Sequence, residues 1–251
     1  MDGLRLWSED SLTLDKRRHI VRGMGTLRWK TDERTADAAK RYCPIKSDLP
    51  GKQFEGRTFH AHRWERRVMQ PSAWPSGLLR SSPERIIQQF EAGRYTQALA
   101  MIVSWGTMAR TSRAIWGARK PAAIDKVLHD CAERTEESES IEDSWDLLTG
   151  QGEGKLGWSD VMASKTLHFL CRSLGFCENP PAPIDGKIIV QRVWPDFREN
   201  SKDSSVEGWR APDRSFDAYS RYMSAISIWA EHKHWTTTDV ETALFAEFNS
   251  R

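Results

Sequence analysis

The sequence lacks any long uninterrupted apolar run, and this absence excludes a simple membrane-spanning architecture. A transmembrane helix needs roughly 18 or more consecutive apolar residues, and no stretch of the 251 residues approaches that length. Residues 1–30 scatter charges among their apolar side chains, so they do not form the apolar core of a signal peptide. We therefore expect a soluble protein of the cytoplasm that does not contact membranes.

Cysteine is also scarce. The four cysteines are Cys43, Cys131, Cys171 and Cys177. They are too few and too dispersed for a disulfide framework in a chain of this length. Cys171 and Cys177 lie close together, but no second pair completes a four-thiolate zinc or iron–sulfur site. We expect reduced, mostly buried thiols, no metal, no iron–sulfur cluster and no other cofactor.

Strand patterns are missing as well, and helical signals take their place. No segment alternates apolar and polar residues convincingly over several positions, which argues against half-buried strands. Ser81-Ser82-Pro83-Glu84 supplies a cap, a proline in the first turn and an acid, all typical of a helix start. After Pro121, apolar residues recur at spacings of three and four. The predicted fold class is all-α, with two lobes and a cleft between them.

The organisation along the chain predicts an N-terminal segment and a helical core. Residues 1–80 are rich in Arg and Trp and show no long periodic segment, so we expect them to pack on the rest. Residues 81–251 form the core. The glycine-rich stretch at 151–157 (QGEGKLG) is the candidate hinge between lobes at 81–150 and 151–251.

The charge distribution is more informative than the net charge of +2. Basic residues cluster near the N-terminus and around Arg110 and Arg113, whereas acidic residues concentrate between Glu133 and Asp146. This separation suits a molecule that turns one basic face toward phosphates. Ordinary solvated surface charge explains the same pattern equally well from charge alone.

Three predicted helix starts in the C-terminal half of the chain carry candidate functional residues. Ser164 is predicted to cap a helix, which puts Lys165 in the first turn, where the helix dipole disfavours a cation. Asp185 is predicted at the start of the next helix, where its carboxylate is a favourable cap. Thr238-Asp239-Val240-Glu241 predicts a capping box that opens the last helix.

These residues carry a resemblance to a known family. Ala163-Ser164-Lys165, an apolar helix, and then Pro183-Ile184-Asp185 before another helix resemble the helix–hairpin–helix DNA glycosylases, in their 8-oxoguanine DNA glycosylase-like branch. In that superfamily a lysine begins the helix after the hairpin, and an aspartate follows about one helix and one loop later. The 20-residue separation of Lys165 and Asp185 fits that plan. The resemblance implies a monomeric two-lobed enzyme on double-stranded DNA, with its hairpin and catalytic region at 157–194.

The chemistry of base excision explains why those two residue types would be needed. Breaking an N-glycosidic bond builds positive charge on C1′ of the sugar, as in glycoside hydrolysis. By the resemblance, Asp185 stabilises that charge, and Lys165 is the candidate nucleophile if burial lowers the pKa of its amine. A lysine attack leaves a Schiff base that can proceed to strand cleavage. Without it, water attacks and an intact abasic site remains.

The resemblance also implies a set of contacts to DNA and to a flipped base. The candidate DNA-binding residues are Lys187, Ser164, Arg110 and Arg113. The candidate base-pocket residues are His168, Phe169, Ser173, Glu241, Phe245 and Trp105. In this interpretation Lys187 faces a phosphate, the helix start at Ser164 offers N–H donors, and Trp105 stacks a base.

Several alternatives remain open at this stage. The family hairpin usually carries glycines, and residues 161–164 have none, so either the hairpin is reshaped or Val161 takes the lysine's place. The substrate is either 8-oxoguanine or a bulky cytosine such as glucosylated 5-hydroxymethylcytosine, on which a family relative in phage defence acts. The polar set of His168, Ser173 and Glu241 favours the bulkier base. A non-catalytic module that binds DNA or senses damage, and an all-α protein adaptor, are the rival functions.

Overall fold

The computed structural model describes residues 27, 29–51, 55, 57–60, 78–106, 121–177, 179–201 and 215–249, and most of these residues are helical. The predicted all-α class is therefore confirmed. The described residues also contain an unforeseen antiparallel pair of short strands, β1 (Arg57–His60) and β2 (Leu78–Ser81). Each strand has four residues, too few to produce an alternating pattern in the sequence.

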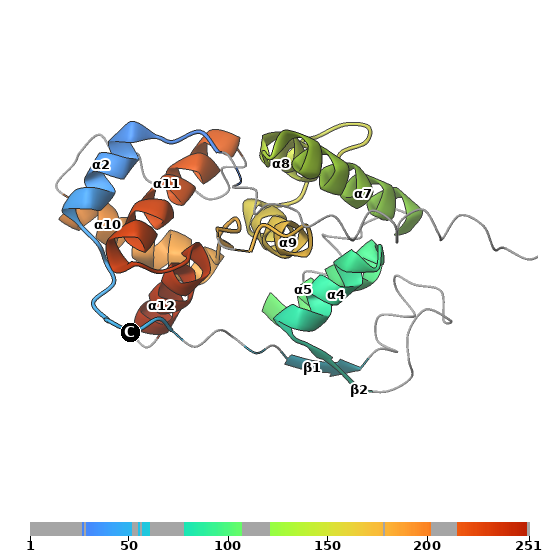
Figure 1. Ribbon diagram of the computed structural model, residues 1–251, viewed down its shortest axis with the longest axis horizontal. Helices are drawn as coiled ribbons and strands as arrows, with labels where there is room; N and C mark the ends of the chain where they lie inside the picture. Colours follow the sequence, from blue (N-terminus) through green and yellow to red (C-terminus); the bar gives the residue numbers. More distant parts are fainter. Residues whose placement is uncertain are drawn as a thin grey trace, which may run out of the picture.

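The helices pack in two groups, which lie on opposite sides of Figure 1. The first group contains α4 (Pro83–Glu91), α5 (Tyr95–Gly106), α7 (Pro121–Ser138), α8 (Glu142–Thr149) and α9 (Asp160–Ser173). The second contains α2 (Glu33–Arg41), the π-helix η3 (Gly186–Val193), α10 (Trp194–Asn200), α11 (Phe216–Lys233) and α12 (Thr237–Asn249). Helices α8 and α11 contact each other across the groups. The cleft between lobes stays a prediction.

Helix α9 packs with the helices that precede it in the chain. It contacts α4, α5, α7 and α8, and every residue from Met162 to Cys171 is buried. The packing therefore changes group after α9, and the hinge at 151–157 stays a prediction. A helix buried on all sides has no single apolar stripe, so its sequence did not indicate which neighbours would surround it.

The described part of the N-terminal segment contacts both groups, because β1 and β2 contact α5 whereas α2 packs on the second group. Asp32 caps α2 by accepting a hydrogen bond from the Thr35 amide at 2.8 Å. The Asp32 amide donates to Ser224 Oγ at 2.9 Å, and α2 lies along α11. The expected role of the rest of residues 1–80 stays a prediction.

Helices α8 and α9 are joined by a hairpin that contains the glycine-rich stretch. The Leu156 and Trp158 amides donate to the carbonyls of Leu147 and Leu148 at 2.9 and 2.8 Å, which folds the loop back on α8. Gly157 has φ +61°, and a Cβ there would lie 2.9 Å from the Gln151 side chain. Residues 161–164, which were matched to the family hairpin, lie within α9, and the glycines lie in the turn that precedes it. The reshaped hairpin and the shifted alignment both stay predictions.

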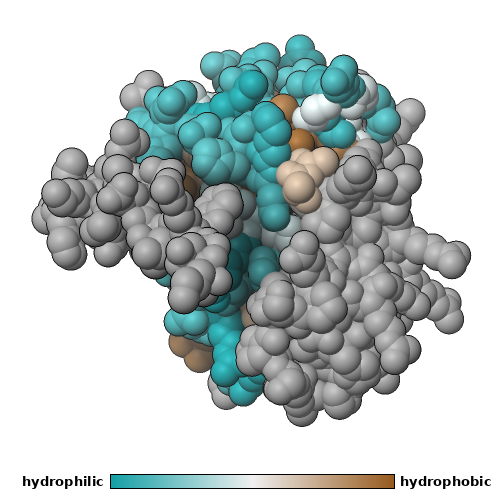
Figure 2. Space-filling view, turned by 90° about the vertical axis from the view of Figure 1, so that its right-hand side faces the viewer, coloured by the Kyte–Doolittle hydropathy of each residue, from teal (hydrophilic) through white to brown (hydrophobic). Residues whose placement is uncertain are grey.

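The surface of the described residues is mostly hydrophilic on the face that Figure 2 turns toward the viewer. The apolar residues of these helices are collected in one core cluster instead. Among the described residues, no helix combines the length and the apolar character that crossing a membrane requires.

Candidate active site

Lys165 lies in the middle of α9 rather than at its start. The helix begins at Asp160, and Ser159 is its N-cap, accepting from the Met162 amide at 3.4 Å. The prediction that Ser164 caps the helix and that Lys165 occupies its first turn is therefore wrong. Lys165 is only 4% exposed. Its burial, not its place in the helix dipole, is the unusual feature of this lysine.

Asp185 lies at the start of a helix, as predicted. It is the N-cap of η3, and its Oδ1 accepts hydrogen bonds from the amides of Lys187 and Ile188, both at 2.9 Å. These two bonds orient the carboxylate and leave Oδ2 for other partners. The element that follows is a π-helix, a rare form that occurs often at functional sites.

The two predicted catalytic residues are brought together. Lys165 Nζ lies 3.9 Å from Asp185 Oδ2 and 5.9 Å from the centre of the Trp105 ring. Burial lowers the pKa of Lys165, and the negative charges of Asp185 and Glu241 oppose that effect. Because burial is the largest of these influences, a larger share of the amine is neutral and able to act as a nucleophile.

Glu241 joins this pair from α12. The predicted capping box at 238–241 is wrong by two residues, because Thr236 and Asp239 form it: Asp239 Oδ2 accepts from the Thr236 amide at 3.0 Å, and Thr236 Oγ1 accepts from the Asp239 amide at 3.1 Å. Glu241 is therefore not the carboxylate of that box. Burial raises the pKa of Glu241 to about 7, opposed by the Lys165 charge and reinforced by that of Asp185. The site thus holds one amine and two carboxyl groups.

The raised pKa of Glu241 makes the stability of the protein depend on pH. Between about pH 4.5 and 7 the unfolded chain loses this proton before the folded one does, so stability falls as pH rises through that window. Glu241→Gln removes the effect. We expect the free energy of unfolding of the wild type, relative to Glu241→Gln, to fall from pH 5 to pH 8 by up to about 3 kcal/mol.

Denaturant titrations at both pH values measure this difference. The exposed Glu137→Gln variant is the control and should follow the wild type at each pH. An unchanged difference between wild type and Glu241→Gln would show that Glu241 is ionised in the folded protein at both pH values.

His168 and Ser173 both form hydrogen bonds within the protein. His168 is fully buried, and its Nδ1 donates to the Pro181 carbonyl at 3.0 Å, with the Arg172 guanidinium 3.5 Å from Nε2. Burial and the Arg172 charge lower the pKa of His168 to about 3. Ser173 Oγ donates to the Leu170 carbonyl at 2.7 Å and lies eight residues, about 12 Å of helix, beyond Lys165. Both side chains are therefore engaged within the protein, and their place in a base pocket stays a prediction.

The aromatic members of the predicted pocket differ in position. Phe169 is fully buried and meets Trp105 edge to face, with ring centres 5.2 Å apart. It therefore supports the tryptophan ring that lies beside the Lys165 amine. Phe245 is half-buried and packs on the core cluster.

The predicted DNA-binding residues are only partly described. Lys187 is exposed at the start of η3, where a phosphate could reach it. Ser164 is fully buried within α9, so it offers no helix-start amide. The first turn of α9 is instead capped by Ser159 and by Asp160 Oδ1, which accepts from the Val161 amide at 2.8 Å. Arg110 and Arg113 lie outside the described residues.

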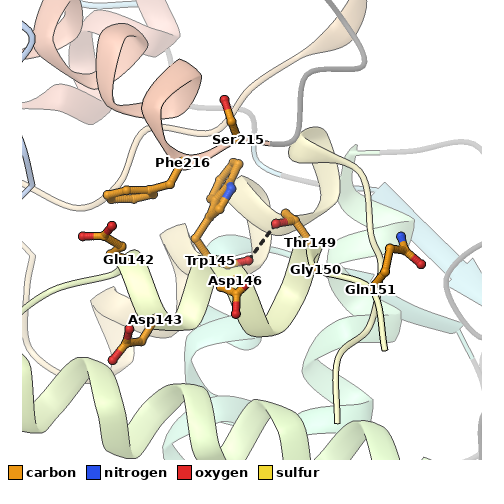
Figure 3. A pocket seen from close by; sticks show the side chains of 9 residues that line it. All are labelled: Glu142, Asp143, Trp145, Asp146, Thr149, Gly150, Gln151, Ser215 and Phe216. Carbon is orange, nitrogen blue, oxygen red and sulfur yellow. Dashed lines mark hydrogen bonds between the residues drawn. The ribbon is translucent and has the colours of Figure 1, made fainter. Parts of the chain in front are cut away.

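A surface pocket of about 620 Å³ opens between α8 and the start of α11 (Figure 3). Three carboxylates line it together with the rings of Trp145 and Phe216; these carboxylates are Glu142, Asp143 and Asp146. The acidic lining repels phosphate, and neither Lys165 nor Asp185 contributes to it. We therefore do not place DNA in this pocket.

One group of described residues has the donor types of a metal site. His129, Asp130 and Glu133 on α7 bring their ligand atoms within 4.8 Å of one another. The cluster is largely exposed, and Lys126 already pairs with Asp130 at 2.8 Å.

The four cysteines are free, with Cys131 and Cys171 buried, Cys43 half-buried and Cys177 exposed. The expectation of mostly buried thiols thus holds fully for two of the four.

Sequence reasoning missed one polar residue close to the predicted catalytic pair. Tyr222 on α11 is fully buried, and its hydroxyl donates to the Pro183 carbonyl at 3.1 Å. Burial raises its pKa well above the usual value, and the charges of Glu241 and Asp185 add to the effect. The only sequence signal was a tyrosine on an otherwise apolar helix face, which is equally typical of a core aromatic residue.

Comparison with known proteins gives one match. Residues 51–245 match the model of a family described as "Putative 8-oxoguanine DNA glycosylase OGG-like protein". No curated protein and no solved structure matches the chain. The matched span includes Lys165, Asp185 and Glu241.

Proposed function

Because the chain belongs to the OGG-like 8-oxoguanine DNA glycosylase family, we propose that it excises a modified base from double-stranded DNA through Lys165 and Asp185. Family membership supports the glycosylase class. The observation that supports the assignment of residues is the buried Lys165 amine 3.9 Å from a carboxylate held at a helix start. A non-catalytic DNA-binding module would not need an amine and a carboxylate placed together at the cost of burying the amine.

The proposed reaction uses the two groups in different ways. The neutral Lys165 amine attacks C1′ of the flipped nucleotide, the C1′–N bond breaks, and its electron pair leaves with the base, which takes up a proton. The Asp185 carboxylate lies beside the positive charge that develops on the sugar. The proton that the base takes up comes from the attacking amine. The C1′–O4′ bond of the enzyme–sugar intermediate then breaks and O4′ takes up the second amine proton, which leaves a Schiff base between C1′ and Lys165, from which strand cleavage can follow.

The substrate that this proposal favours is a planar oxidised purine. Two of the three polar residues that suggested a sugar-bearing cytosine, His168 and Ser173, are engaged in internal hydrogen bonds. A base with several hydroxyl groups needs partners for them, since each buried unpaired hydroxyl costs about 1–3 kcal/mol. The Trp105 ring beside the Lys165 amine suits a flat aromatic base better. The description of the family as 8-oxoguanine DNA glycosylase-like agrees with this choice.

A panel of duplexes tests the substrate. We expect 8-oxoguanine to be released with a kcat/KM at least about tenfold above that for glucosylated 5-hydroxymethylcytosine, a difference that one pocket commonly achieves. The measurement is alkali cleavage after incubation with labelled duplexes that each carry one modified base, with an unmodified duplex as the control.

The opposite preference would assign the enzyme to a bulky modified cytosine and leave the glycosylase proposal intact. Tight, salt-sensitive binding of every duplex without release would identify a non-catalytic DNA-binding module, because phosphate contacts weaken steeply with salt. Weak binding that does not respond to salt would favour a protein adaptor.

A further inference from the structure

The segment that leads into Asp185 is held by side chains rather than by secondary structure. Residues 180–184 are buried and belong to no helix or strand. Each of the first four carbonyls accepts a hydrogen bond from a different side chain: Thr237 Oγ1 to Pro180 at 2.8 Å, His168 Nδ1 to Pro181 at 3.0 Å, Tyr219 OH to Ala182 at 3.0 Å and Tyr222 OH to Pro183 at 3.1 Å. The donors come from α9, α11 and α12, so three helices fix one short segment.

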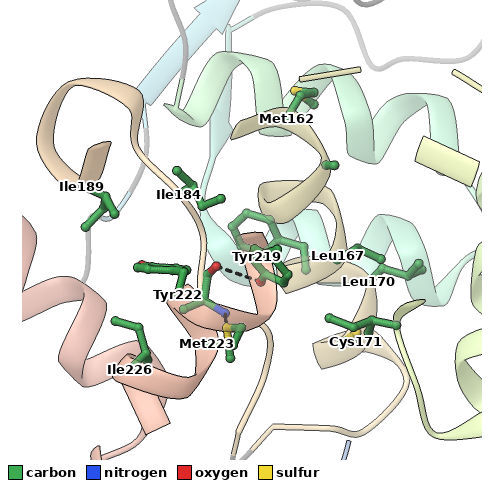
Figure 4. Packing of buried hydrophobic residues seen from close by; sticks show 14 of the residues in the cluster. Met162, Leu167, Leu170, Cys171, Ile184, Ile189, Tyr219, Tyr222, Met223 and Ile226 are labelled. Atoms are coloured by element: carbon green, nitrogen blue, oxygen red, sulfur yellow. Dashed lines mark hydrogen bonds between the residues drawn. The ribbon is translucent and has the colours of Figure 1, made fainter. Parts of the chain in front are cut away.

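The composition of the segment explains this arrangement. Three of its five residues are prolines, which have no N–H group and cannot enter a helix or a sheet ladder here. Their buried carbonyls still need donors. Figure 4 shows Tyr219, Tyr222 and Met223 of α11 beside this segment, and its dashed lines mark the bonds of Tyr219 and Met223 to Ala182.

The last hydrogen bond of the segment joins the residues that directly precede the two proposed catalytic residues. The Ile184 amide donates to Ser164 Oγ at 2.9 Å, and Ser164 Oγ in turn donates to the Val161 carbonyl at 3.2 Å. Ser164 directly precedes Lys165, and Ile184 directly precedes Asp185. A single buried hydrogen bond therefore joins the chain neighbours of the amine and the carboxylate, across the boundary between the two groups of helices.

We propose that Ser164 is a positioning residue, which holds the Asp185 carboxylate at its distance from the Lys165 amine through the bond to the Ile184 amide. Tyr222, which holds the carbonyl two residues before Asp185, assists it from α11. The inference rests on the proposed function, and it replaces the role of Ser164 as a phosphate contact. A misplacement of about 1 Å at a reacting centre can cost about a hundredfold in rate.

Removing the Ser164 hydroxyl tests this role. In Ser164→Ala, we expect the single-turnover rate of base release to fall about ten- to a hundredfold, while the Kd for the duplex stays within about twofold of the wild type. Tyr222→Phe, which removes only a hydroxyl, should show a smaller fall of the same kind. Thr166→Val is the matched control, because Thr166 is fully buried on the same helix and its hydroxyl donates to Met162 of that helix. Its release rate should equal that of the wild type.

Hydrogen exchange of the Ile184 amide gives a second measurement that does not need activity. The exchange should accelerate in Ser164→Ala and not in Thr166→Val. Accelerated exchange with an unchanged release rate would overturn the positioning role while the glycosylase proposal stands. A weaker Kd with an unchanged single-turnover rate would instead make Ser164 a DNA contact. A wild type that releases no base from any duplex would overturn the proposed function and the positioning role together, with the exchange result still reporting the bond.

Discussion

Asp185→Asn should fold and bind DNA as the wild type does and yet release the base about 10²–10³-fold more slowly, the loss typical of removing one electrostatic contact to a transition state. Asparagine keeps the side-chain oxygen that accepts from the Lys187 and Ile188 amides, so the start of η3 stays capped. It removes the negative charge that faces C1′. Since the Asp185 charge raises the pKa of Lys165, its removal also favours the neutral amine, so the loss cannot come from a protonated nucleophile.

Single-turnover release from the preferred duplex measures this effect, together with thermal unfolding and a binding isotherm. Asp32→Asn is the matched control, because Asp32 is likewise an N-cap aspartate, at the start of α2. It should leave the release rate unchanged. Unaltered turnover in Asp185→Asn would remove Asp185 from the active site, and a large loss of stability would reduce its role to that of a cap.

Asp185 could be predicted from the sequence because its signal is local. Prolines before it exclude a helix, and an aspartate at the first possible position caps the helix that follows. The structure confirms that start. Its pairing with Lys165 came only from the family resemblance, since no local pattern reports a contact between residues 20 positions apart.

The starts of α9 and α12 were predicted wrongly because the sequence offers two acceptable capping residues for each helix. Ser159 and Ser164 are both acceptable caps before α9, and the hairpin's bonds to Leu147 and Leu148 favour the earlier one. Thr236 and Thr238 are each followed three residues later by an acid, so the box before α12 was equally ambiguous. In both cases tertiary contacts, which a sequence pattern does not contain, select between two sound alternatives.

The contents of the base pocket were the least predictable part of the site. His168 follows Lys165 by less than one helical turn, and from spacing alone it was a reasonable pocket residue. Its direction is set by the Pro181 carbonyl, 13 residues further along the chain. The same proline-rich segment therefore sets the direction of His168 and leads into Asp185.

Lys165→Gln should abolish covalent trapping of DNA. If the Lys165 amine attacks C1′, borohydride reduces the resulting Schiff base and leaves a stable protein–DNA adduct in the wild type. Glutamine has no nucleophilic amine, so the variant should give no adduct, and base release should fall by orders of magnitude. Burial lowers the pKa of Lys165, so trapping by the wild type should extend to lower pH than an ordinary lysine would allow and decline as further acid protonates the amine.

Denaturing gels of borohydride-treated reactions measure the adduct, and Lys126→Gln, an exposed lysine on α7, is the control that should trap as the wild type does. Good base release by the wild type without any adduct would instead identify a water-using enzyme that leaves an intact abasic site. The alternative alignment would then be preferred, in which Val161, one turn before Lys165 and beside Gly186, takes the lysine's place. In that case Lys165→Gln should retain release, because the Asp185 carboxylate would still face the sugar while water supplied the nucleophile. Trapping that persists in Lys165→Gln would place the nucleophile on a different amine.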